Sequence, residues 1–140
     1  MMKNTILIAA TALLVSACGT NPPKPRPACP SAQQMEQPEL LGTWRAELRG
    51  QPGPVTLQLG KHPEWNGTVK GQIQRPSGNA IVVGDVNQGK LTMEESSDGK
   101  KVSGTWLGDV VAGSCAKEIQ GDWLDDKDNS IPFVMRKQPQ

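Results

Sequence analysis

Three cysteines and a single histidine are the side chains of this sequence with the most reactive chemistry. Cys18 lies near the N-terminus, Cys29 and Cys115 are far apart along the chain, and the histidine is His62. A thiol nucleophile at Cys115 would have only His62 as its base, and no serine has the Gly-x-Ser-x-Gly setting of a hydrolase. We therefore expect a protein that is not an enzyme. The sequence has no motif for a cofactor, and none is expected.

Acidic and amide side chains at residues 125–129 could offer oxygen ligands to calcium. This run lacks the glycine and the terminal glutamate of an EF-hand loop. Such a run is more often a solvated hairpin tip, so we expect no metal site.

The N-terminal residues have the pattern of a secretory signal, with one positive charge at Lys3 and an uncharged run over residues 5–15. The run is too short to span a bilayer. At its end, Val15-Ser16-Ala17-Cys18 resembles the lipobox of bacterial lipoproteins, in which small residues precede an obligatory cysteine. The resemblance implies that residues 1–17 are cleaved, that the Cys18 thiol receives a diacylglyceryl group, and that the new amine is acylated, for example with palmitate. A secreted protein that is cut nearby is the alternative.

The lipobox resemblance also implies a location and a set of partners. Several acyl chains make a stable membrane anchor, and in this family an Asp after the cysteine is the usual signal for the inner membrane. Here that residue is Gly19, so we expect an outer-membrane lipoprotein, by default in the periplasmic leaflet. Without Lys3, fourteen basic residues remain against fourteen acidic ones, and nucleic acid is therefore not an expected partner.

Once Cys18 carries lipid, Cys29 and Cys115 are the two remaining thiols. Exported proteins reside in an oxidising compartment, where such a pair forms a disulfide. We therefore expect a Cys29–Cys115 bond. Two free buried thiols are the alternative.

Residues 18–38 are polar and rich in proline, a composition that favours extended, semi-rigid geometry and is typical of a tether. The best candidate for a helix is the short segment 31–36. We place the folded domain at residues 39–138.

Beyond residue 40, apolar and polar residues alternate with a period of two, as in Trp44, Ala46 and Leu48. This pattern is typical of strands with one buried face. Short segments of this kind, separated by turns, predict an all-β fold of about eight strands. Consecutive hairpins favour an antiparallel up-and-down meander, and its closure into a barrel would remove exposed edges. The run 80–86 is apolar on both faces and is expected to lie deep in the sheet.

The motif Gly-x-Trp occurs three times, ending at Trp44, Trp106 and Trp123. A period of two places each glycine on the same face as its tryptophan, where the missing side chain leaves room for a bulky neighbour. We therefore expect these three indoles to be buried and close to one another.

The first of these motifs, Gly42-Thr43-Trp44, resembles the opening of the avidin and lipocalin superfamily of ligand-binding barrels, and the strand pattern of residues 40–137 is similar. In those families the tryptophan closes one barrel end, so the resemblance implies that Trp44 is part of the core. The sequence has no tyrosine, whereas avidin-like sites hold their ligand partly through tyrosine hydroxyls, so biotin binding is not implied. The chain also resembles small disulfide-bonded periplasmic barrels that inhibit proteases or lysozymes.

A loop containing His62, Glu64 and Trp65 is the candidate contact site for a partner, since tryptophan is favoured at interface hot spots. A lid over one barrel end is the alternative. We expect Trp65 to be the most exposed of the four tryptophans. The leading hypothesis is a non-enzymatic binding module that meets an unknown envelope protein or polymer. The alternatives are a carrier of a small apolar ligand inside a lipocalin-like or avidin-like barrel, which needs a cavity of about 300 Å³, and an inhibitor of an envelope hydrolase.

Overall fold

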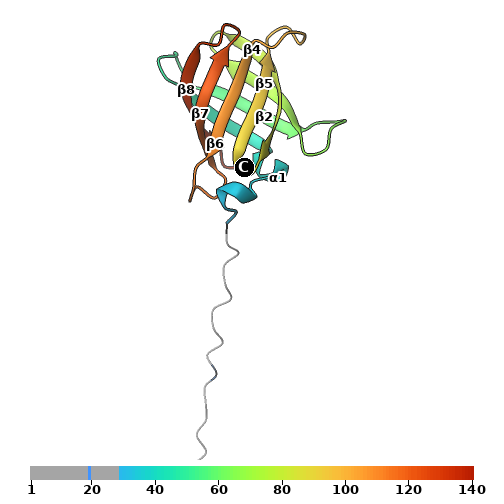
Figure 1. Ribbon diagram of the computed structural model, residues 1–140, viewed down its shortest axis with the longest axis vertical. Coiled ribbons are helices and arrows are strands. Elements are labelled where there is room, and N and C mark those ends of the chain that lie inside the picture. Colours follow the sequence, from blue (N-terminus) through green and yellow to red (C-terminus); the bar gives the residue numbers. More distant parts are fainter. Residues whose placement is uncertain (1–18, 20–28) are drawn as a thin grey trace, which may run out of the picture.

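The computed structural model describes Gly19 and residues 29–140. The strands in this part of the chain form one closed antiparallel barrel (Figure 1). Each of the eight strands pairs with the next along the chain, and β8 pairs with β1 to close the ring. The predicted all-β, up-and-down barrel is confirmed. Cys18 and the expected signal segment 1–17 lie outside the described residues. The elements are η1 (Ala32–Gln34), α1 (Gln37–Leu40), β1 (Gly42–Leu48), β2 (Val55–Lys61), β3 (Val69–Arg75), β4 (Gly78–Asn87), β5 (Lys90–Ser96), β6 (Gly104–Val110), β7 (Glu118–Asp125) and β8 (Ser130–Lys137).

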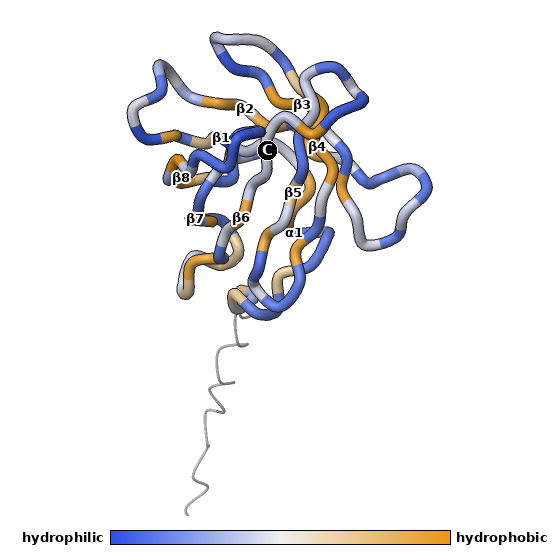
Figure 2. Tube along the Cα trace, turned by 45° about the horizontal axis from the view of Figure 1, so that its top comes forward, coloured by the Kyte–Doolittle hydropathy of each residue, from blue (hydrophilic) through white to orange (hydrophobic). Residues whose placement is uncertain are grey.

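The alternating pattern places one apolar face of each strand inside the barrel, and Figure 2 shows apolar and polar residues alternating along the chain. Trp44, Trp106 and Met135 are fully buried, and Trp106 packs edge-to-face on Phe133 with 4.9 Å between ring centroids. The barrel centre is therefore filled by its own side chains, as small eight-stranded barrels can be.

One expectation about β4 is wrong. The run 80–86 was expected to be deep on both faces, but Ile81 is 42% exposed whereas its neighbour Val82 is buried. A closed barrel wall has an inner and an outer face, so a β-branched run in it leaves every second side chain outside.

Two glycines permit the close packing of the barrel wall. A Cβ atom at Gly121 would lie 1.9 Å from the carbonyl oxygen of Leu107 on β6, and one at Gly104 would lie 2.5 Å from the indole nitrogen of Trp123. Both distances are far below van der Waals contact. The expected role of leaving room for an indole is thus confirmed at Gly104, whereas Gly121 permits the close approach of the β6 backbone.

The N-terminal helices close one end of the barrel. Met35 and Leu40 are buried there, the Trp44 indole donates to the carbonyl of Leu40 at 2.8 Å, and the Gln37 amide donates to the carbonyl of Thr68 at 2.6 Å. The helix expected at 31–36 is a 3-10 turn followed by a short α-helix. Residues 29–38 were predicted to belong to the tether. In the structure they pack on the barrel instead. No helix among residues 29–140 is long and apolar enough to cross a membrane.

The last strand is also fastened at this closed end. The Lys137 ammonium donates to the carbonyl of Glu39 and lies 5.8 Å from the centre of the Trp44 ring. Burial lowers the pKa of Lys137 below its usual value. This contact joins α1 to β8 beside the seam between the first and last strands.

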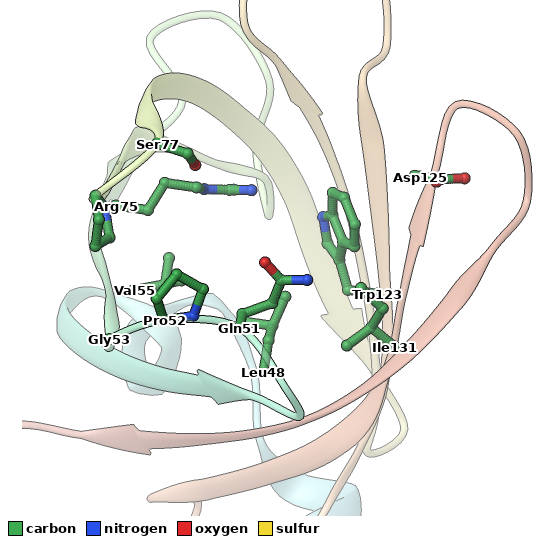
Figure 3. A pocket seen from close by; sticks show the side chains of 11 residues that line it. Leu48, Gln51, Pro52, Gly53, Val55, Arg75, Ser77, Trp123, Asp125 and Ile131 are labelled. Atoms are coloured by element: carbon green, nitrogen blue, oxygen red, sulfur yellow. The ribbon is translucent and has the colours of Figure 1, made fainter.

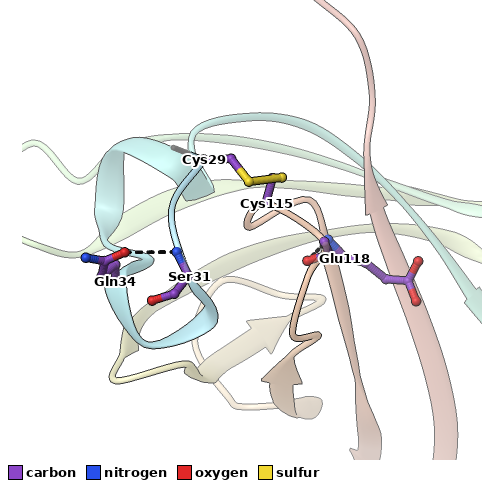
Figure 4. Close-up of a disulfide and its surroundings, with 6 residues drawn as sticks. Cys29, Ser31, Gln34, Cys115 and Glu118 are labelled. Carbon is purple, nitrogen blue, oxygen red and sulfur yellow. Dashed lines mark hydrogen bonds between the residues drawn. A yellow bond between two sulfur atoms is a disulfide. The ribbon is translucent and has the colours of Figure 1, made fainter. Parts of the chain in front are cut away.

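Cys29 and Cys115 form a disulfide at the same end, with 5.0 Å between their Cα atoms (Figure 4). The expected pairing is confirmed. Cys115 lies in the β6–β7 loop, so the bond joins the start of the folded segment to a point 86 residues further along the chain. The Cys115 sulfur is bonded to Cys29 and is not a free nucleophile.

Removing this disulfide is expected to destabilise the barrel. The double substitution Cys29→Ser and Cys115→Ser should lower the free energy of unfolding by about 2–5 kcal/mol, because the unfolded chain regains a long loop. Urea unfolding followed by tryptophan fluorescence measures the change. Wild-type protein in a reductant is the control and should match the variant, and equal midpoints for the variant and the oxidised wild type would contradict the prediction.

Candidate functional site

The end of the barrel opposite the helices is an open mouth. The β1–β2, β3–β4, β5–β6 and β7–β8 connections lie around it, and it holds a pocket of about 280 Å³ (Figure 3). The pocket is lined by Leu48, Gln51, Pro52, Gly53, Val55, Arg75, Pro76, Ser77, Trp123, Asp125 and Ile131.

Three side chains at the mouth continue the inward-facing pattern of their strands. Arg75 on β3, Glu95 on β5 and Trp123 on β7 each lie two positions beyond an inward-facing residue of the same strand. Because the three strands run in the same direction in the meander, these ends meet at the same rim. The regular alternation of the barrel thus brings a guanidinium, a carboxylate and an indole together.

Glu95 is the acceptor that organises this group. It is only 3% exposed, and its Oε2 atom accepts from Arg75 Nη2 at 2.6 Å and from Trp106 Nε1 at 2.8 Å. An unpaired carboxylate at this depth would be costly, and charge-assisted hydrogen bonds of this length offset that cost. Glu95 therefore holds the Arg75 side chain at the mouth.

Two buried N–H donors at the mouth have no hydrogen-bond partner among the described residues: Arg75 Nε and Trp123 Nε1. The Arg75 Cζ atom lies over the Trp123 ring, 5.7 Å from its centre, and Figure 3 shows the two side chains facing each other across the pocket. A buried donor without a partner costs about 1–3 kcal/mol. An acceptor atom that reached either nitrogen would therefore be stabilised.

The rest of the pocket wall is mainly apolar. Leu48, Val55 and Ile131 supply carbon surface, and Figure 3 shows the Gln51 amide directed toward the space between Arg75 and Trp123. Below them the core is closed by the packed rings of Trp106 and Phe133. A bound group would therefore sit in the mouth and not pass through the barrel.

Asp125, at the rim, closes the β7–β8 turn. Its Oδ1 atom accepts from the backbone amides of Lys127 and Asn129 at 2.9 and 2.8 Å, and its Oδ2 atom accepts from the Asn129 side chain at 2.8 Å. The hydrogen bonds from Asn129 lower the pKa of this carboxyl group. The run that could have offered calcium ligands thus uses its first carboxylate to cap the turn.

The predicted contact residues His62, Glu64 and Trp65 lie together in the β2–β3 loop at the closed end. The rings of His62 and Trp65 are stacked, with 4.2 Å between centroids and 3° between planes, and His62 Nδ1 accepts from the amide of Trp65 at 3.1 Å. Trp65 is 57% exposed. A role of this loop in binding stays a prediction, and the structure adds the mouth as a second candidate.

Three of the four tryptophans have the degree of exposure that was predicted. Trp44 and Trp106 are fully buried and Trp65 is the most exposed, as predicted, but Trp123 is only partly buried. The strand β7 carries Trp123 to the rim, where one side of the indole packs on Gly104 and the other faces the pocket. The indole that was expected in the core therefore belongs to the candidate site.

Arg75 and Glu95 are not among the predicted site residues, although the sequence carries a signal for both. Glu95 follows Leu91 and Met93 at a spacing of two, and Arg75 follows Ile73 in the same way. The predicted inward positions were all apolar residues or glycines. Extension of the alternation to the next inward position would have placed both charges inside one end of a barrel.

Comparison with protein-family models found no match to this chain, and comparison with curated protein sequences found no significant relative. The class of the protein therefore comes from its architecture. It is a small eight-stranded antiparallel barrel, compatible with a lipocalin-like or avidin-like fold.

Proposed function

We propose that this protein is a non-enzymatic binding module of the bacterial envelope, anchored by lipid on Cys18, and that the barrel mouth is its binding site. The observation that carries the proposal is the pocket between Arg75 and Trp123, where two buried N–H donors have no partner among the described residues. Binding needs no catalytic group, and this pocket combines apolar walls with a few convergent polar atoms, as ligand sites do.

The anchor is supported by the lipobox-like residues before Cys18 and by the position of Cys29. Ten residues separate these two cysteines, and covalent geometry limits their reach to about 40 Å. Cys29 is fastened at the closed end, opposite the mouth. In the proposed arrangement the mouth is directed away from the membrane. The residue that follows the anchor is Gly19 and not Asp, which favours the outer membrane.

Substitution of Cys18 by Ala is expected to abolish lipidation, because Cys18 alone follows the small-residue cleavage motif. Cells grown with an alkyne-tagged fatty acid should show a labelled protein for the wild type and none for the variant. Cys115→Ala is the matched control and should remain labelled. Label on the Cys18→Ala protein would refute the anchor.

The binding site is tested by blocking the mouth. Ser77 is exposed and lines the pocket, so Ser77→Trp should fill the mouth without removing a buried contact. Envelope components that co-purify with the wild type should be lost from this variant and retained by Trp65→Ala, which changes the closed end. Loss with Trp65→Ala and retention with Ser77→Trp would move the binding site to the β2–β3 loop.

A carrier of a small ligand is the second candidate, and the same pocket favours it. The volume of about 280 Å³ is close to the lower limit for small-molecule sites, about 300 Å³. Since the barrel centre is filled, such a ligand would be small and would sit in the mouth. Recovery of a bound small molecule from protein purified under native conditions would favour this function over a macromolecular partner.

A further inference from the structure

We infer that the mouth recognises an uncharged amide carbonyl next to an apolar side chain, as in an acylated leucyl residue of a partner. The inference deepens the proposed function and rests on it, because it assigns the ligand chemistry of the same pocket. Three features of the mouth support it: N–H donors without a partner, the balance of charge, and an apolar wall.

The donors select an oxygen acceptor. Arg75 and Trp123 both line the pocket, and the buried Nε of Arg75 and Nε1 of Trp123 have no acceptor among the described residues. Both groups can only donate, since an arginine nitrogen and an indole nitrogen have no lone pair to offer. A ligand that pairs with either group therefore has to present an acceptor, and a carbonyl oxygen supplies two lone pairs for this.

The charges select a neutral ligand. The positive charge of Arg75 is already balanced by Glu95, whose oxygen lies 2.6 Å from the guanidinium. Asp125 adds a second carboxylate at the rim. The charged side chains that line the pocket are thus Arg75 and Asp125, with Glu95 buried behind Arg75, and a carboxylate ligand would add a third negative charge to this group. A carbonyl oxygen makes the same hydrogen bonds without that repulsion.

The wall selects an apolar group beside the carbonyl. Leu48, Val55 and Ile131 form the carbon surface that faces the indole of Trp123. The amide of Gln51 points into the same space and can pair with the N–H of a ligand amide (Figure 3). An amide flanked by a branched aliphatic side chain satisfies all three features at once.

The test uses the indole N–H signals in proton–nitrogen NMR spectra of the lipid-free chain, residues 19–140, with its disulfide intact. The probes are 4-methylpentanamide and 4-methylpentanoate, which carry the same branched aliphatic chain and differ only in ending in a neutral amide or in a carboxylate. The amide is expected to shift the Trp123 indole signal saturably and to leave the Trp65 signal in place. The carboxylate is expected to bind at least about tenfold more weakly.

Two variants assign the effect to the proposed donor. Trp123→Phe keeps an aromatic ring and removes the N–H group, so affinity for the amide probe should fall about three- to tenfold. Trp65→Phe is the matched control at the other end and should leave affinity unchanged. The comparison of the two probes on the wild type needs no variant, so the test holds even if Trp123→Phe folds poorly.

Equal or tighter binding of the carboxylate probe would overturn the inference, as would the absence of any shift with the amide probe. The proposed function fails separately, if Ser77→Trp leaves the co-purified envelope components unchanged. A partner lost with Ser77→Trp while neither probe binds would therefore keep the mouth as the binding site and reject the amide carbonyl as its ligand.

Discussion

Glu95→Ala is expected to lower the free energy of unfolding by about 3–5 kcal/mol, the usual cost of removing one partner of a buried ion pair. The substitution leaves the Arg75 guanidinium and the Trp106 indole N–H without the acceptor that they share. For a domain of this size, the melting temperature should fall by more than about 10 °C. Thermal and urea unfolding, followed by near-ultraviolet circular dichroism, measure the change.

The matched control for this prediction is the double variant Arg75→Met and Glu95→Leu. Replacing both members of a buried pair by apolar side chains is often neutral or stabilising, so the double variant should recover at least about 2 kcal/mol of the loss. The Trp106 N–H remains unpaired in it and limits the recovery. A double variant as unstable as Glu95→Ala would show that pairing does not explain the loss.

Trp106→Ala is expected to cost about 3–5 kcal/mol of unfolding free energy, because it opens a cavity in a packed core. The indole is fully buried, packs on Phe133 and donates to Glu95. Truncation therefore removes an aromatic contact and one of the two hydrogen bonds to a buried carboxylate. The expected effect belongs to the upper part of that range.

Trp65→Ala is the comparison for Trp106→Ala and should change stability by less than about 0.5 kcal/mol. Trp65 is exposed, and its main aromatic partner is the neighbouring His62 in the same loop. Urea midpoints of the two variants measured under the same conditions give the comparison. Similar losses for both would mean that the β2–β3 loop is a structural lid and would remove it from the candidate contact sites.

Most of the fold was predictable because a closed antiparallel barrel repeats one simple rule. Alternation with a period of two fixed the inward positions of β1, β2 and β8, and short turns favoured sequential pairing. The packing of the N-terminal helices η1 and α1 on the barrel end was harder to predict in this way. Met35 is a single apolar residue in a segment without period, and its burial depends on the barrel end that it covers.

The candidate site was harder to predict than the fold because its charges depend on partners in three dimensions. Glu95 is acceptable inside the barrel only because Arg75 and Trp106 reach it from other strands. Sequence distance gives no sign of those contacts. His62, Glu64 and Trp65 were found together because they are adjacent in the chain, and their loop lies at the other end of the barrel.

The Cys29–Cys115 bond determines how the barrel would bear mechanical load. Tension in the chain before Cys29 is transmitted to the β6–β7 loop through the disulfide bond. It therefore does not act on η1, α1 or the seam between β1 and β8. With the bond reduced, the same tension would first peel away the helices and then separate β1 from its two neighbouring strands, one pair of hydrogen bonds after another. The disulfide therefore makes the seam between β1 and β8 independent of tension in the N-terminal segment.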